Sequence, residues 1–171
     1  MKKALPNVYV LTAICLITAL LLAVVNNFTL PVINAAEEKA TQEALLEVLP
    51  GGGSFTKTDV STIDTSKCET TVQEIYKASN GGCVVKLMSA GYSTGLQIMV
   101  GVNADGTVSG SKCLASQETL GYEKTYGESL LGADKNSISG IATVSGATKT
   151  TTGYKKAVTD ALKVAAALSG N

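Results

Sequence analysis

The side chains best suited to chemistry lie together in one stretch near the C-terminus. Residues 145–152 hold five hydroxyl groups in eight positions, those of Ser145, Thr148, Thr150, Thr151 and Thr152. Gly146 and Ala147 are small enough for a ligand to approach the backbone, and Lys149 adds a positive charge. A helical pattern follows, and the unpaired N–H groups of a helix start attract phosphate. The stretch predicts a phosphate-binding loop, although an ordinary helix cap has the same composition.

The missing residue types narrow the chemistry further. The chain has no histidine, and all fourteen of its positively charged side chains are lysines. Without histidine it has no Ser–His or Cys–His pair and no histidine ligand for haem or zinc. Without arginine, and with its fourteen lysines balanced by fourteen acidic residues, it is poorly equipped to bind nucleic acid. The protein's own side chains therefore supply few tools for acid–base catalysis.

The N-terminal part has the composition of a membrane anchor. Residues 4–36 contain no charged side chain, and residues 8–25 are almost entirely apolar. As a helix, residues 8–25 would extend about 27 Å, close to the thickness of the hydrocarbon core of a bilayer. Lys2 and Lys3 precede this run and acidic residues follow it, which by the positive-inside rule places the N-terminus in the cytoplasm.

Two alternatives to an uncleaved anchor are a cleaved signal peptide and a type IV pilin. The apolar run is long for a signal peptide, and the residues before Ala36 lack a small-residue cleavage pattern. A pilin also begins with an apolar helix, but here Phe28 follows the apolar run instead of opening it. We therefore favour the uncleaved anchor.

Residues 37–171 form the second part of the chain. They carry twelve lysines and fourteen acidic residues, a net charge of −2, and they are numerous enough to bury a core. We therefore divide the protein into a cytoplasmic N-terminus with a transmembrane anchor, residues 1–36, and an extracytoplasmic domain, residues 37–171. Within the domain, residues 37–49 are expected to form an amphipathic stalk helix that ends at Pro50.

The pattern of the domain predicts an α+β fold, an antiparallel sheet flanked by helices. Residues 54–70 are rich in Ser, Thr and Asp and are expected to be a loop. Strands are expected at residues 72–78, 83–88, 95–102 and 107–115, with a last short strand at residues 141–144. A C-terminal helix is predicted from an apolar stripe at helical spacing, which consists of Tyr154, Val158, Ala161, Leu162, Ala165 and Leu168.

The four cysteines do not form a recognisable metal site. Cys15 lies within the apolar run, and the spacings of Cys68, Cys83 and Cys113 fit no zinc or iron–sulfur pattern. Three cysteines in the domain allow at most one intramolecular disulfide. The other interpretation is that they are small buried residues on strands.

The hydroxyl-rich stretch resembles a flavin attachment motif. Residues 145–148 (SGAT) match the S/T-G-A-T motif of the FMN-binding domain found in the G-type subunit of Rnf electron-transport complexes and in the C-type subunit of the sodium-pumping NADH:quinone reductase. The order of features is also similar to that of the Rnf protein: an uncharged span, a stalk ending in Leu49-Pro50-Gly51, a hairpin at residues 95–106, and the motif followed by one helix. The resemblance implies FMN joined by a phosphoester to Thr148, with cofactor contacts from Ser145, Gly146, Ala147, Lys149 and Thr150.

A second motif of this family lies near the flavin ring. The family has E-T-P-G-L-G, and the matching residues 118–123 are ETLGYE here. Tyr122 replaces the family's leucine, and it either stacks on the ring or anchors the loop as a half-buried side chain. The family also has an aspartate three residues before the motif's serine, where this chain has Ala142. The resemblance implies further cofactor contacts by Glu118, Thr119, Gly121 and Tyr122.

The resemblance implies an electron-transfer subunit of an ion-translocating ferredoxin:NAD oxidoreductase. Such a subunit relays electrons through covalent FMN outside the membrane and has no turnover of its own, which agrees with the missing acid–base residues. Its partners would be the other membrane subunits and, during maturation, a flavin transferase that uses FAD and a divalent metal. The alternatives are a membrane-anchored FMN-binding domain of another extracytoplasmic reductase or respiratory chain, and a non-redox surface protein.

Overall fold

The computed structural model describes residues 5–170, with their side chains except those at residues 5–8, 34 and 37. The chain separates into two compact units, Met1–Gln42 and Glu43–Asn171, and each is considered by itself. Lys2 and Lys3, on which the predicted orientation of the anchor depends, lie outside the described residues.

Helix α1, Leu5–Val48, makes up the described part of the first unit and continues into the start of the second. In the first unit its large apolar side chains, including Leu22 and Phe28, are exposed on all sides, as expected for a helix surrounded by lipid. By length and composition it is the one helix among residues 5–170 that could cross a membrane. The helix continues through Pro31, so the predicted span and the predicted stalk are parts of one helix.

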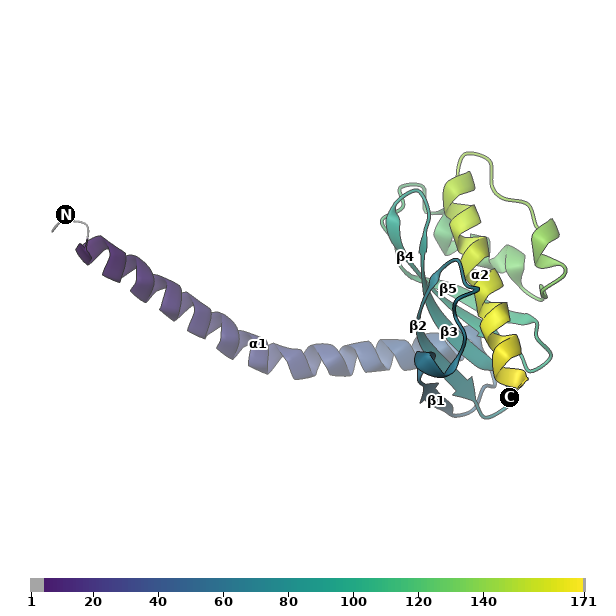
Figure 1. The fold of residues 1–171 in the computed structure, drawn as a ribbon, viewed down its shortest axis with the longest axis horizontal. Coiled ribbons are helices and arrows are strands. Elements are labelled where there is room, and N and C mark those ends of the chain that lie inside the picture. The colour runs from purple at the N-terminus through teal and green to yellow at the C-terminus, as the bar shows by residue number, and fades with distance from the viewer. Residues whose placement is uncertain (1–4, 171) are drawn as a thin grey trace. The chain divides into compact units, whose positions relative to one another are not determined.

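The second unit is built on a five-stranded antiparallel sheet (Figure 1). Each strand pairs with the next along the chain, so the strand order is β1-β2-β3-β4-β5. The predicted antiparallel sheet flanked by helices is therefore confirmed. The strands are β1 Phe55–Thr58, β2 Thr71–Ala78, β3 Cys83–Ala90, β4 Thr94–Val102 and β5 Val108–Ala115.

Two local predictions are wrong. Strand β1 lies inside the segment expected to be a loop. Its mostly polar sequence does not predict a strand, and the strand forms because it pairs with β2 at the edge of the sheet. Residues 141–144, expected to be a strand, are irregular. Side chains from other segments bind the carbonyl groups that a strand would use for pairing. Tyr126 donates to the carbonyl of Ala142, and Lys155 donates to that of Ile141.

The two faces of the sheet are covered by different helices. Helix α2, Thr148–Ser169, packs on one face with Val85, Leu87 and the other inward side chains of β3 and β4. The last turn of α1 packs on the other face, where Leu45 contacts the cluster that includes Val84 and Met99. Because successive strand residues point to opposite faces, Val84 and Val85 belong to different cores. The predicted apolar stripe of α2 is confirmed, with only Leu168 partly exposed at its end.

A pair of glycines lets the end of α1 approach the sheet closely. Gly101 of β4 and Gly110 of β5 lie opposite each other in the register. A Cβ atom at either position would collide with the carbonyl oxygen of Val48. The glycines therefore form a notch that seats the end of the helix against the backbone of the sheet.

All four cysteines are free thiols in the structure. Cys83 is buried on β3, and this burial raises its pKa to about 11. Cys113 lies on β5 and Cys68 in the irregular segment before β2, and burial raises the pKa of both thiols. These thiols are therefore poor nucleophiles near neutral pH.

Candidate functional site

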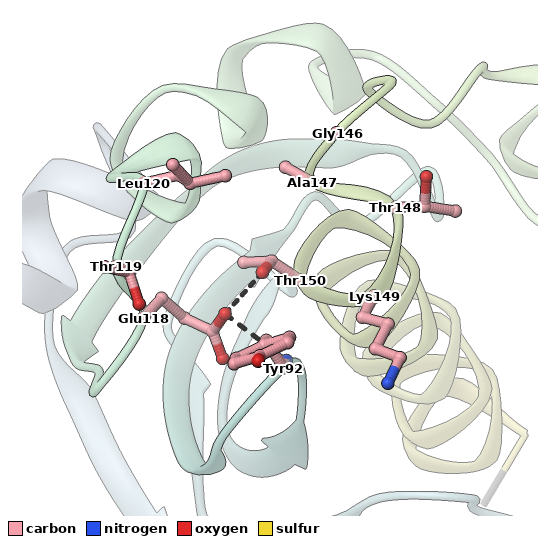
Figure 2. Close-up of a pocket in the computed structure, with 9 residues that line it drawn as sticks. All are labelled: Tyr92, Glu118, Thr119, Leu120, Gly146, Ala147, Thr148, Lys149 and Thr150. Atoms are coloured by element: carbon pink, nitrogen blue, oxygen red, sulfur yellow. Dashed lines mark hydrogen bonds between the residues drawn. The ribbon is translucent and has the colours of Figure 1, made fainter.

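An open pocket of about 460 Å³ lies beside the start of α2. Three segments that are distant in the sequence form it: the β3–β4 turn, the loop after β5, and the turn into α2. Figure 2 shows the loop after β5 on the left, the turn into α2 along the top and right, and the β3–β4 turn at the bottom. The lining residues are Tyr92, Glu118, Thr119, Leu120, Gly146, Ala147, Thr148, Lys149 and Thr150.

Helix α2 begins inside the hydroxyl-rich stretch, at Thr148, and not after it. Gly146 turns the chain into the helix with a φ of +85°, a conformation that favours glycine, and Ala147 is the N-cap. Ala147 provides no side-chain cap, and its carbonyl accepts the N–H of Thr151 at 2.9 Å. The preceding N–H groups of the first turn have no partner within the helix. These donors, the helix dipole and the charge of Lys149 make the start of α2 suitable for a phosphate.

Three threonines of this turn have different surroundings. Thr148 is exposed, and its hydroxyl makes only a long 3.4 Å contact with the carbonyl of Val144. Thr150 is buried, with its hydroxyl on the carboxylate of Glu118. Thr151 is completely buried; it donates to the carbonyl of Ala147 at 3.0 Å and accepts the N–H of Val144 at 3.3 Å. Of the three hydroxyls, the one on Thr148 is accessible from outside.

Glu118 joins the three segments around the pocket (Figure 2). Its carboxylate accepts the hydroxyl of Thr150 and the backbone N–H groups of Ser93 at 3.0 Å and Tyr92 at 3.3 Å. Burial acts to raise the pKa of Glu118, but these hydrogen bonds outweigh it and hold the pKa below its usual range. Gly91 makes the arrangement possible, because a Cβ there would clash with the carboxylate. Ionised Glu118 therefore fixes the β3–β4 turn to the start of α2.

The structure gathers most, but not all, of the residues predicted to bind a cofactor. Ser145 is exposed beside the pocket but does not line it. Gly121 and Tyr122 do not line it either: Gly121, with a φ of +74°, leads into the short 3-10 helix η2, Tyr122–Lys124. The predicted residues that line the pocket are Glu118, Thr119, Gly146, Ala147, Thr148, Lys149 and Thr150.

Two lining residues, Tyr92 and Leu120, were not predicted. Leu120 occupies the position of the family's proline, so the motif did not predict a cofactor contact there. Tyr92 gave no signal beyond being a single aromatic residue between two strands. Its position depends on hydrogen bonds with Glu118, which is distant in the sequence.

The residues present fit a flavin mononucleotide. The exposed hydroxyl of Thr148 offers a point of attachment, and the first turn of α2 with Lys149 offers positive charge for a phosphate. Leu120, Ala147 and Tyr92 offer apolar surface for a ring system. The volume of the pocket lies within the range of about 300–1,000 Å³ that is usual for small-molecule sites.

Comparisons with known proteins agree with this geometry. The family model for the FMN-binding domain matches residues 91–163, a range that contains every lining residue of the pocket. The family model for the RnfG N-terminal region matches residues 1–48. A comparison with curated proteins found no match. The two family matches together cover most of the chain, and the chain belongs to the RnfG family, with an FMN-binding domain.

Proposed function

We propose that this Rnf subunit relays electrons through an FMN held by a phosphoester on Thr148. The observation that carries the proposal is the exposed hydroxyl of Thr148, at the start of α2 and at the mouth of a pocket within the FMN-binding domain. The neighbouring hydroxyls of Thr150 and Thr151 are buried and occupied by hydrogen bonds. The flavin supplies the redox chemistry, and the protein supplies attachment and orientation.

The attachment step requires a separate flavin transferase with FAD as donor. The oxygen of Thr148 attacks the phosphorus on the FMN side of FAD. A new P–O bond forms, the bond to AMP breaks, and AMP leaves while the hydroxyl proton passes to a base of the transferase. The chain itself has no histidine, and Glu118, the carboxylate of the pocket, is occupied by Thr150 and the β3–β4 turn. Activation of Thr148 therefore comes from outside the chain.

A covalent bond suits a domain on the outer side of the membrane. We assign residues 1–36 to the cytoplasmic N-terminus and anchor, and residues 37–171 to an extracytoplasmic domain with residues 37–49 as its stalk. A flavin that dissociated there would be lost by dilution. The phosphoester prevents this loss and also holds the phosphate without an arginine.

In the complex, this subunit would work with the other membrane subunits, which couple electron flow between ferredoxin and NAD to translocation of Na⁺ or H⁺. It would have no turnover alone. The match to the RnfG N-terminal region supports this setting over a free-standing reductase domain.

The proposal is tested by intact mass. The full chain is made with and without a co-expressed flavin transferase, together with Thr148→Ala and Thr152→Ala as a matched control. Thr152 is a partly buried hydroxyl of the same turn but does not line the pocket. With the transferase we expect one FMN, less one water, on the wild type and on Thr152→Ala, and none on Thr148→Ala; without it we expect none on any chain. A wild type that stays unmodified in the presence of the transferase, or an adduct that persists on Thr148→Ala, would overturn the proposal.

A further inference from the structure

Tyr92 is a large aromatic side chain left open to solvent at a pocket. It lies in the turn between β3 and β4, and 72% of its surface is exposed. Leu120, which lines the same pocket from the loop after β5, is 64% exposed. Two exposed apolar side chains on separate walls of one pocket are typical of a surface that a ligand covers.

The backbone of Tyr92 is fixed. Its N–H and that of Ser93 both donate to the carboxylate of Glu118, and the N–H of Gly91 donates to the carbonyl of Ser93 at 3.0 Å. The carboxylate is in turn held by Thr150 of α2. The turn therefore presents Tyr92 from a position set by its neighbours, although the side chain itself is exposed.

The face of the Tyr92 ring is turned toward the start of α2, the segment that carries Thr148. The ammonium group of Lys149, the next residue after Thr148, lies over the ring at 5.5 Å from its centroid. A cation–π contact of this kind is made with the face of an aromatic ring and not with its edge, so this face points toward Lys149. A planar group attached at Thr148 would meet the same face once the flexible Lys149 side chain moves aside.

We infer that Tyr92 stacks on the isoalloxazine ring of the FMN that Thr148 carries, with Leu120 on the opposite side of the ring. This inference rests on the proposed function. Aromatic rings favour offset stacking, which adds to the gain from burial of their area. Tyr122, for which the sequence left stacking and anchoring open, does not line the pocket.

Flavin emission tests the stacking. An electron-rich phenol or indole ring in contact with an excited flavin donates an electron to it and quenches its fluorescence, whereas an aliphatic side chain does not. The full chain is co-expressed with a flavin transferase as wild type, Tyr92→Leu, Tyr92→Trp and Tyr122→Leu. Intact mass gives the fraction that carries FMN, and emission is expressed per attached flavin.

We expect the wild type and Tyr122→Leu to be equally dim, Tyr92→Leu to be several-fold brighter, and Tyr92→Trp to be as dim as the wild type. An emission from Tyr92→Leu equal to the wild type, at equal FMN content, would overturn the stacking and leave the attachment intact. A brighter Tyr122→Leu with an unchanged Tyr92→Leu would assign the role to Tyr122. Absence of FMN from every chain would overturn the proposed function, and the stacking with it.

Discussion

The first turn of α2 and the remainder of the same helix differ in burial and in hydrogen bonding. In the first turn, Thr148 and Lys149 are exposed, whereas Thr150 and Thr151 are buried and hydrogen-bonded. From Tyr154 onward the helix is part of the core: Ala157, Val158 and Ala161 are completely buried against the sheet. The buried Asp160 accepts the N–H groups of residues 69 and 70 and so ties the segment before β2 to the helix.

This difference separates the part of the helix that stabilises the domain from the part that can be modified. A reactive hydroxyl must be reachable by another enzyme, yet its position must be defined. The long buried segment of α2 fixes the helix axis, and the Thr150–Glu118 contact fixes its first turn. Thr148 is thus exposed on a rigid support. The following substitutions test the division, beginning with the largest expected effect on stability.

Tyr154→Ala should destabilise the domain most. Tyr154 is 1% exposed, packs edge to face on Tyr126, and its hydroxyl donates to Ser111 at 3.1 Å. Removal of a large buried aromatic side chain costs about 3–5 kcal/mol. Urea unfolding of the full chain in detergent measures the loss. Tyr154→Phe, which removes the hydroxyl alone, should cost about 1 kcal/mol; equal losses from both variants would contradict the importance of the ring packing.

Glu118→Gln should have a smaller effect that depends on pH. The folded pKa of Glu118 lies below its usual value, so its stabilisation is complete above the unfolded pKa and is lost as the pH falls through the folded pKa. At neutral pH the variant should be about 1.5 kcal/mol less stable than the wild type, because charged hydrogen bonds are lost. The difference should shrink below about pH 4, the ordinary range of a glutamate.

The matched control for this substitution is Glu128→Gln. Glu128 is exposed and lies outside the pocket. Its substitution on the surface should change stability by less than about 0.5 kcal/mol. A difference between the wild type and Glu118→Gln that stays constant from pH 7 to pH 3 would show that ionised Glu118 does not hold the pocket together.

Gly146→Ala should cost about 1 kcal/mol, because an L-residue is strained at a φ of +85° even where space is open. Gly140→Ala is the control, since Gly140 also has open space but no positive φ. Thermal unfolding of the two variants separates the strain from the added methyl group. Equal stability of both would contradict the conformational role of Gly146.

Thr148→Ala should have the smallest effect on stability. The side chain is exposed and its one hydrogen bond is long, so the change should stay within about 0.5 kcal/mol. The same thermal unfolding measures it. A loss as large as that of Tyr154→Ala would show that Thr148 belongs to the core and would remove the division between the part of the helix that can be modified and the part that stabilises the domain.

The sequence was sufficient for the features that repeat along the chain. The uncharged length of α1, the alternation in β4 and the apolar stripe of α2 are each regular patterns within one segment, so each predicts an element. Strand β1 and the irregular residues 141–144 depend on partners elsewhere in the chain, and no local pattern revealed them.

The candidate site divides in the same way. Residues 146–150, Glu118 and Thr119, which line the pocket, could be predicted because they stand in short motifs. Tyr92 could not, because it reaches the pocket only through the pairing of β3 with β4 and the contacts of Glu118. Tyr122 shows the limit of a motif: its place there left ring stacking and anchoring both open, and the structure places it in η2 after the left-handed turn at Gly121, outside the lining of the pocket.

The central claim is that one hydroxyl of the first turn carries the flavin. The most direct measurement is tandem mass spectrometry of peptides from the wild-type chain, co-expressed with a flavin transferase, that locates the FMN among residues 145–152. Thr148 is exposed and lines the pocket, Thr150 and Thr151 are buried, and Ser145 and Thr152 do not line the pocket, so we predict FMN on Thr148 alone. FMN on Thr150 or Thr151, or an even distribution over the hydroxyls, would contradict the account.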